Sequence, residues 1–258
     1  MSPYTLWLAA LPVMLAVGLL AWAIATPRQN AGLVDIFWSL FFLAGTVTYA
    51  LLHAQLGTRG LIVVILVTAW ALRLAGYLAK RNWDAPEDHR YRAIRKRNEP
   101  GFTWKSLYLV FGMQAVLAWF ISAPLAAAIG AGATIGMLDV IGLAIAVLGI
   151  VVETLADAQL ARFKAVPANA GKVMDRGLWR YTRHPNYFGE FCFWWGLYGI
   201  ALGAGAWWTV FSPLVMTLLL LKVSGVTLLE KDIGERRPGY REYVARTNAF
   251  FPGPRRQA

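Results

Sequence analysis

The segment Gly177–Glu190, GLWRYTRHPNYFGE, places cations, hydrogen-bonding side chains and one carboxylate directly before an apolar run. Charged groups at the mouth of a membrane helix are unfavourable there unless they bind something. We therefore interpret this segment as a polar binding site at a membrane surface. The alternative is a positive-inside anchor, in which the cations only set the orientation of the helix.

Further polar residues form stripes within or beside the apolar runs. Glu153, Asp157 and Lys164 are offset by 4 and 11 residues, which places them within roughly 40° of one another on a helix. Two other stripes repeat every four residues: Arg73, Tyr77 and Arg81, and Asn186 and Glu190. An ionisable side chain inside a membrane span is a candidate functional residue by default. The alternative is that these groups only pair with one another across helices.

The stripes open toward basic segments that contain Lys172, Arg176 and Arg183. A matching ligand would be anionic at one end and would carry hydroxyl or amide groups elsewhere. A nucleotide cofactor fits this description. Cations would hold its phosphates, carboxylates would accept hydrogen bonds from ribose hydroxyls, and an asparagine would bond to an amide.

Membrane helices must position these residues. The chain has 258 residues, 58% of them hydrophobic, and a mean hydropathy of +0.49, far above soluble domains. A bilayer span needs roughly 20 apolar residues. Seven runs reach about that length: 4–26, 33–53, 61–79, 106–129, 137–161, 187–205 and 207–229. The sequence predicts an all-α integral membrane bundle of seven helices that forms a single domain, 1–258.

The net charge of +11 is explained by membrane topology. Of the 25 Lys and Arg residues, eight lie in 80–105, six in 162–185 and seven in 230–258. The intervening loops contain only Arg59. The positive-inside rule therefore predicts an external N-terminus and a cytoplasmic C-terminus, in the inner membrane if the source is bacterial. Nucleic acid is not needed as a partner to account for the charge.

The cysteine and histidine content predicts no metal site. Cys192 is the single cysteine, so neither an intramolecular disulfide nor a cysteine-based metal cluster can form. The three histidines, His53, His89 and His184, have no ligand spacing.

Five segments together resemble the bacterial branch of the steroid 5-alpha-reductase family: Val34–Trp38, Arg73–Tyr77, Glu87–Tyr91, Gly177–Glu190 and Arg237–Tyr243. The resemblance covers nearly the whole chain. It implies a seven-helix enzyme that binds NADPH from the cytoplasmic side. Its substrate would be a lipophilic enone that enters from the bilayer, such as a Δ4-3-ketosteroid, whose carbon–carbon double bond is reduced. The shorter string Arg183–Tyr187 also resembles sterol reductases and isoprenylcysteine and phospholipid methyltransferases.

The resemblance implies which residues contact the cofactor. Carried over residue by residue, the family's contacts fall on Asp157, Lys164, Lys172, Asn186 and Glu190. Both lysines stand where animal members look to have arginines, which leaves the preference between NADPH and NADH open. The other cofactor-binding residues that we expect are Arg73, Arg81, Arg176, Arg183, His184, Tyr187, Arg237, Tyr240 and Tyr243.

The family's catalytic carboxylate matches Asp35, where the animal branch is expected to have a glutamate. Its partner tyrosine falls on Trp70, which has no phenol, so either Tyr77 substitutes for it or Asp35 acts alone. In apolar surroundings Asp35 is expected to be protonated and to polarise the substrate carbonyl. The alternative is a salt bridge from Asp35 to Arg73 that joins the second and third helices. Trp38 and Trp70 are expected to contact the substrate.

The polar segments 80–105, 162–185 and 230–258 are expected to fold over the nucleotide as a cytoplasmic cap. For the tail, the alternative is an amphipathic stretch on anionic lipid headgroups. Two other functions stay open. One is methyl transfer from S-adenosylmethionine to a lipid or prenyl thiol, with Glu190 and His184 holding the amino acid end of the cofactor. The other is a lipid-binding or scaffold protein that binds neither cofactor.

Overall fold

The computed structural model describes residues 1–53, 55–132, 134–223 and 239–256. It is 78% helical and the described residues contain no strand, which confirms the all-α prediction. Five helical segments are long and apolar enough to cross a membrane: Pro3–Ala25, Ala31–Leu52, Thr58–Asn82, Phe102–Ile121 and Met137–Ala165. They coincide with the first five predicted spans, so the chain has the helices of a multi-pass integral membrane protein.

The last two predicted spans correspond to weaker apolar helices. α9 (Pro185–Gly203) covers most of 187–205 but is not apolar enough to count as a span, because it carries Glu190 and several Trp, Tyr and Gly residues. The helical segment Trp207–Lys222 is apolar but short. The remainder of the seventh predicted span, beyond residue 223, lies outside the described residues.

Contacts within the chain define two compact units. The first unit comprises residues 1–139 and 200–212, and the second comprises 140–199 and 213–258. The prediction of a single domain is not tested by this division. The larger helices of the first unit are α1 (Pro3–Ala25), α2 (Val34–Leu52), α3 (Thr58–Asn82), α4 (His89–Asn98), α5 (Phe102–Ser106), α6 (Met113–Ile121) and α7 (Ala123–Ile129). A 3-10 turn, η1 (Ala31–Leu33), precedes α2, and a π-helical turn, η2 (Leu107–Gly112), joins α5 to α6.

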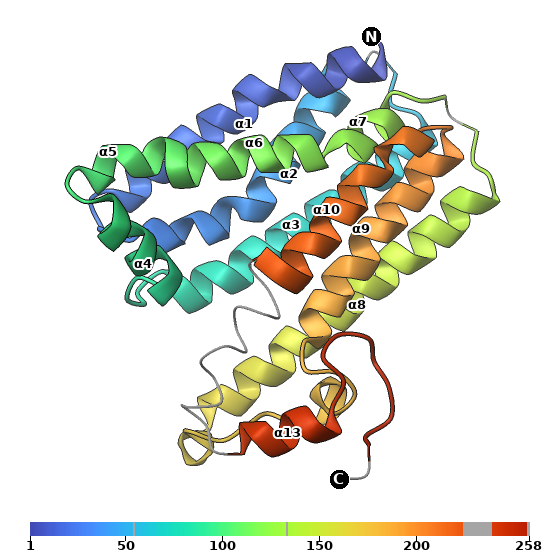
Figure 1. Ribbon diagram of the computed structural model, residues 1–258. Helices are drawn as coiled ribbons and strands as arrows, with labels where there is room; N and C mark the ends of the chain where they lie inside the picture. The colour runs from blue at the N-terminus through green and yellow to red at the C-terminus, as the bar shows by residue number, and fades with distance from the viewer. Residues whose placement is uncertain (54, 133, 224–238, 257–258) are drawn as a thin grey trace. The chain divides into compact units, whose positions relative to one another are not determined.

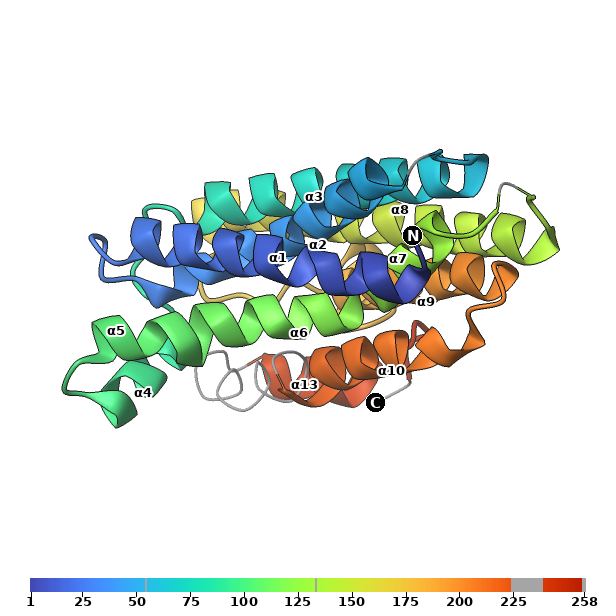
Figure 2. The same cartoon turned by 90° about the horizontal axis from the view of Figure 1, so that it is seen from above.

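In the first unit α1 packs against α2 and α6, and α2 packs against α3 (Figures 1 and 2). Gly18 allows the close approach of α1 to η2, because a Cβ there would lie 3.3 Å from the carbonyl oxygen of Phe111. Only 28% of the apolar window of α1 is buried. Because α1 is apolar all round, its uncovered side suits lipid rather than water.

The second unit is built on α8 (Met137–Ala165) and α9, whose backbones touch at glycines. A Cβ at Gly189 would lie 2.6 Å from the nitrogen of Glu153, and one at Gly196 would lie 2.5 Å from the nitrogen of Ala146. Small residues of this kind let two membrane helices approach closely. This contact sets Asn186 of α9 beside Asp157 of α8. The unit also contains most of α10 (Phe211–Leu218), the short turns η3 (Pro167–Asn169) and η4 (Gly177–Arg180), the π-helical turn η6 (Leu219–Val223) and α13 (Tyr240–Arg246).

The arginine of the predicted external loops is part of a buried ion pair in the first unit. Arg59, 4% exposed, donates from Nε and Nη2 to the carboxylate of Asp139 at 2.6 and 3.0 Å. Its Nη1 also donates to the carbonyl oxygen of Gly132 at 2.7 Å. The pair joins the start of α3 to the start of α8. Because Asp139 offsets the charge of Arg59, this cation is compensated within the protein.

Removing one partner of this ion pair should destabilise the protein strongly. Arg59→Ala leaves the Asp139 carboxylate buried without its cation, which costs about 3–5 kcal/mol. We expect a clear drop in the Tm of the purified protein in detergent. The double variant Arg59→Leu/Asp139→Leu should lose less than Arg59→Ala, because it leaves no buried charge. An Arg59→Ala protein with the wild-type Tm would contradict this assignment.

Candidate functional site

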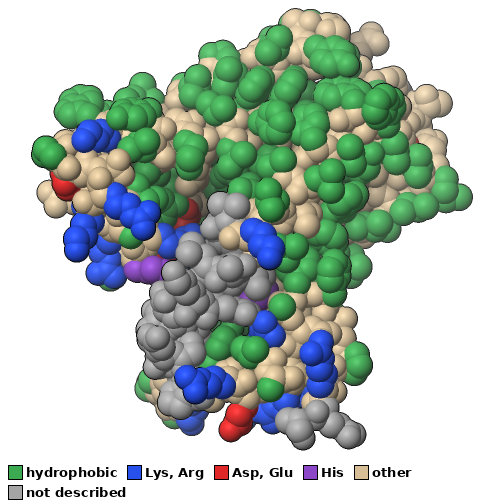
Figure 3. Space-filling view, viewed as in Figure 1, with side chains coloured by type: hydrophobic (Ala, Val, Ile, Leu, Met, Phe, Trp, Pro, Cys, Tyr) green, Lys and Arg blue, Asp and Glu red, His purple; other side chains and the backbone are tan. Residues whose placement is uncertain are grey.

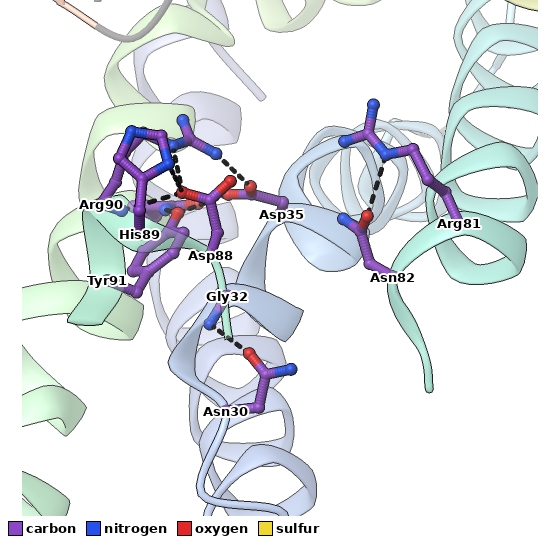
Figure 4. A network of polar contacts seen from close by, with 10 residues as sticks. Asn30, Gly32, Asp35, Arg81, Asn82, Asp88, His89, Arg90 and Tyr91 are labelled. Atoms are coloured by element: carbon purple, nitrogen blue, oxygen red, sulfur yellow. Dashed lines mark hydrogen bonds and ion pairs between the residues drawn. The ribbon is translucent and has the colours of Figure 1, made fainter. Parts of the chain in front are cut away.

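Asp35 lies in the first turn of α2 and accepts hydrogen bonds from two residues of α4 (Figure 4). Nη2 of Arg90 donates to its Oδ2 at 3.0 Å, and the hydroxyl of Tyr91 donates to its Oδ1. Asp88 caps the N-terminus of α4 by accepting from the backbone nitrogen of Arg90 at 2.9 Å. The cation that pairs with Asp35 is therefore Arg90 of α4, in place of the Arg73 salt bridge considered from the sequence.

Tyr91 is buried, and its hydroxyl bonds to two groups. It donates to Asp35 and accepts from Nε2 of Gln114 at 3.1 Å. Burial, followed by the negative charge of Asp35, raises the pKa of Tyr91 well above its usual value. Tyr91 therefore stays protonated at neutral pH. Burial alone would lower the pKa of Arg90, but the carboxylate of Asp35 more than compensates and the guanidinium stays charged.

The π-helical turn η2 precedes Gln114. A π turn holds about one residue more than an α-helical turn, so the residues after it are rotated by about 100°. Gln114 is the second residue after η2 and reaches the hydroxyl of Tyr91. Sequence reasoning missed the roles of Arg90, Tyr91 and Gln114. The motif Glu87–Tyr91 was part of the family resemblance and was the available signal for the first two, whereas nothing in the sequence marked Gln114.

The two tryptophans expected to contact substrate are linked through one aromatic ring. Trp38 of α2 meets Phe42 edge-on at 5.3 Å, and Phe42 meets Trp70 of α3 at 5.8 Å. Trp70 is fully buried, so it contributes to the packing of α2 on α3. Their contact with a substrate stays a prediction.

The expected stripe on α3 lies on one helix, as the periodicity requires. The guanidinium of Arg81 lies over the ring of Tyr77, 5.6 Å from its centroid, and donates to Asn82 at 2.9 Å. Arg73 and Tyr77 are half-buried. The phenol bonded to Asp35 is that of Tyr91, so the structure offers a different tyrosine for the partner role considered for Tyr77.

In the second unit, three acidic side chains are buried where α8 and α9 meet: Glu153, Asp157 and Glu190. Nδ2 of Asn186 donates a hydrogen bond to Oδ1 of Asp157 at 3.4 Å. His184 is buried and stacks on Tyr187, with ring centroids 5.6 Å apart and an interplanar angle of 5°. The structure thus brings together Asp157 and Asn186, two of the predicted cofactor residues of these helices.

The predicted cations of the second unit lie at its solvent-exposed edge. Lys164 is in the last turn of α8, and Lys172 and Arg176 follow in the loop, each with an exposed side chain. The loop then returns to α8 through Trp179, whose Nε1 donates to the carbonyl oxygen of Ala156 at 3.1 Å. The exposed cations therefore sit next to a segment that is firmly packed on α8.

Two other predicted cofactor residues hold the tail in place. Nη1 of Arg183 donates to the carbonyl oxygen of Thr247 at 2.6 Å. The hydroxyl of Tyr243 donates to the carbonyl oxygen of Trp179 at 2.6 Å, and burial raises the pKa of Tyr243. Tyr240 is buried with its ring 5.8 Å from that of Tyr243. These bonds dock α13 on the segment that precedes α9, while the contact of these residues with a cofactor stays a prediction. Arg237 lies outside the described residues.

The helices and these polar clusters define a multi-pass α-helical membrane protein with titratable groups at its helix ends. A family model described as "Protein of unknown function (DUF1295)" matches residues 21–247. The chain belongs to this family, which is a steroid 5-alpha-reductase-like family. The chain is also 27% identical over 268 residues to the uncharacterised protein C594.04c of Schizosaccharomyces pombe, covering 92% of this chain and 76% of that protein. No solved structure matches the chain significantly.

The cap of α4 should make stability depend on pH. Burial alone would raise the pKa of Asp88, but hydrogen bonds from Arg90 hold it below its usual 3.8. A carboxylate whose pKa is lower in the folded state than in the unfolded state stabilises the fold at pH values above its unfolded-state pKa. This stabilisation is lost as the pH falls through its folded-state pKa. Asp88→Asn keeps a capping side chain but removes the charge. Its Tm in detergent should be slightly below that of wild type at about pH 7, and the gap should close near about pH 3.

Asp88→Ala is the matched control, because it removes the cap as well as the charge. Its deficit should persist at the acidic pH, where the charge no longer contributes. A gap between wild type and Asp88→Asn that stays the same at both pH values would contradict the role given to the Asp88 charge.

Proposed function

We propose that this protein reduces the carbon–carbon double bond of a membrane-soluble enone, with NADPH as the hydride donor. A Δ4-3-ketosteroid reduced to its 5α form is the leading substrate class. The observation that carries the proposal is the bonding of Asp35 to Tyr91 and Arg90 at a helix end in a steroid 5-alpha-reductase-like family. We propose seven spans for the chain, with the N-terminus outside and the C-terminus in the cytoplasm, where NADPH is available.

The reaction needs an acid beside the carbonyl oxygen. When hydride adds to the β-carbon of an enone, negative charge develops on that oxygen and has to be stabilised. In the proposed mechanism Asp35 and Tyr91 share this task, and the hydrogen-bonded pair provides the proton that polarises the carbonyl. Arg90 positions Asp35 from one side, and Gln114 positions the hydroxyl of Tyr91 from the other. The enolate then takes a proton from water at the α-carbon, which completes the addition of two hydrogens.

The residues of the second unit have the chemistry that NADPH requires. The carboxylates of Asp157 and Glu190 can accept hydrogen bonds from hydroxyls, and the amide of Asn186 can bond to another amide. The exposed lysines, Lys164 and Lys172, are point charges suited to phosphates. NADPH would supply the hydride when bound. This excess of cations suits a cofactor with phosphates better than S-adenosylmethionine, which has no phosphate group.

Turnover should depend on Tyr91 and Asp35 and much less on Tyr77. We expect purified protein to oxidise NADPH with some members of a panel of enones that includes Δ4-3-ketosteroids, followed by the absorbance of the reduced nicotinamide. Asp35→Asn and Tyr91→Phe should each lower kcat by about a hundredfold or more, because Tyr91→Phe removes the shared proton and Asp35→Asn removes the carboxylate that shares it. Tyr77→Phe is the matched control and should stay close to wild type. Full turnover by Tyr91→Phe would remove Tyr91 from the mechanism.

Cofactor choice can be measured separately from turnover. NADPH should raise the Tm of the protein and S-adenosylmethionine should not. Lys164→Gln and Lys172→Gln should each weaken NADPH binding on the order of tenfold, through loss of a charge-assisted contact to phosphate. Arg162→Gln, an exposed cation on the same helix, serves as the control and should bind normally.

Each alternative function predicts a different binding result. Stabilisation by S-adenosylmethionine alone would favour a methyltransferase. Stabilisation by neither compound would favour a lipid-binding or scaffold protein.

A further inference from the structure

The first unit contains a half-open cavity of about 460 Å³ that the proposed reaction does not use. Residues from the end of α1, from α4 and from α5 line it. Ala25 ends one candidate membrane helix and Phe102 begins another, so both helices reach the cavity at their ends. Nearby, the rings of Trp22 and Trp104 lie 5.1 Å apart, and Trp104 is 69% exposed. Exposed tryptophans gather at the level of lipid headgroups, which places the cavity at that level.

The inner wall of the cavity is a compensated ion pair. Arg95 donates from Nε and Nη2 to the two carboxylate oxygens of Glu87, at 2.9 and 2.8 Å. Glu87 also accepts from the backbone nitrogen of Ala31 at 2.8 Å, and the guanidinium of Arg95 lies 4.6 Å from the centroid of the Phe102 ring. Since each charge here already has its counter-charge, this wall contributes shape more than net charge.

Two opposite charges remain at the cavity, one on each side of Arg95. Arg92 of α4 stands three residues before Arg95, and Glu99, the C-cap residue of α4, stands four residues after it, so the three follow one face of the helix. Arg92 and Glu99 are about 10 Å apart along the helix axis, a span that their long side chains can shorten. Among the residues that the structure describes, the side chain of Arg92 has no hydrogen-bond or ion-pair partner. The carboxylate of Glu99 accepts one 3.5 Å contact from the nitrogen of Phe102 and interacts electrostatically with Arg95.

The surroundings of the cavity fit a lipid. Hydrophobic side chains cover the long helices of the first unit, while Lys and Arg side chains gather around α4 (Figure 3). Leu19 and Leu20 of α1 and Tyr108 beyond α5 are exposed large hydrophobic residues close in sequence to the lining residues. A ligand held at the cavity could therefore lay an apolar part along these helices and keep its polar part at α4.

We propose that this cavity binds the phosphoethanolamine headgroup of a membrane phospholipid. Arg92 binds the phosphate, and Glu99 binds the ammonium, which is a donor of three hydrogen bonds. The two charges of the pocket match the two charges of this zwitterion. A phosphatidylglycerol headgroup has no cation for Glu99, and it leaves that carboxylate facing an anionic lipid.

The test titrates delipidated full-length protein in detergent with phosphatidylethanolamine or phosphatidylglycerol, and native mass spectrometry measures the bound lipid. Wild type should bind phosphatidylethanolamine more tightly, on the order of tenfold. Arg92→Gln should weaken binding of both lipids by a similar factor. Glu99→Gln should keep binding but abolish the preference for phosphatidylethanolamine. Arg97→Gln, an exposed cation of α4 outside the cavity, should match wild type.

Three results would overturn the proposal. The first is equal affinity of the wild type for both lipids, or tighter binding of phosphatidylglycerol. The second is unchanged binding by Arg92→Gln, or a loss of binding in Arg97→Gln as large as in Arg92→Gln, which would reveal a general attraction to a basic helix. The third is a Glu99→Gln variant that keeps the wild-type preference. None of these results depends on NADPH or on turnover.

Discussion

The structure depends on the unfavourable free energy of an uncompensated charge in apolar surroundings. In the first unit this constraint determines which elements are joined. Arg59 ties the start of α3 to Asp139, and Arg90 ties α4 to Asp35 at the start of α2. Each pair joins segments that are far apart in sequence. Charge compensation therefore positions α4, a polar helix in which only Tyr91 is buried.

Close packing of backbones plays the corresponding part in the second unit. At Gly149, Gly189 and Gly196 no side chain would fit between α8 and α9. If either helix moved by one residue along the other, a larger residue would have to occupy a glycine position, where it does not fit. The rotation of each helix about its axis is therefore fixed. This fixed rotation keeps Asn186 within 3.4 Å of Asp157 and buries the neighbouring carboxylates. The polar side chains that could bind a ligand are thus positioned by glycines, which have no side chain to bind one.

The sequence predicts features that depend on local pattern. Hydropathy locates five spans because each is a continuous apolar run. It is weaker over α9, because aromatic and glycine residues pack well in a helix without being strongly apolar. Helical periodicity likewise predicts the stripe that contains Asp157. It could not predict that Tyr91 bonds to Asp35, since the two are 56 residues apart and their contact depends on where α4 docks. Reasoning along one helix led instead to Tyr77.

The segment before α9 shows that a polar cluster at a helix end can have a structural role and a binding role at the same time. Nη1 of Arg183 donates a hydrogen bond to the backbone at the C-terminal end of α13. The hydroxyl of Tyr243 donates one to the carbonyl oxygen of Trp179, in the same segment as Arg183. These groups therefore hold the tail, which explains part of the cluster without any ligand. Asn186 contacts Asp157 of α8 and Glu190 is buried, a setting that tail docking does not require. The tail bonds fix the segment that leads into α9, and a fixed segment is what a precise binding site on that helix needs.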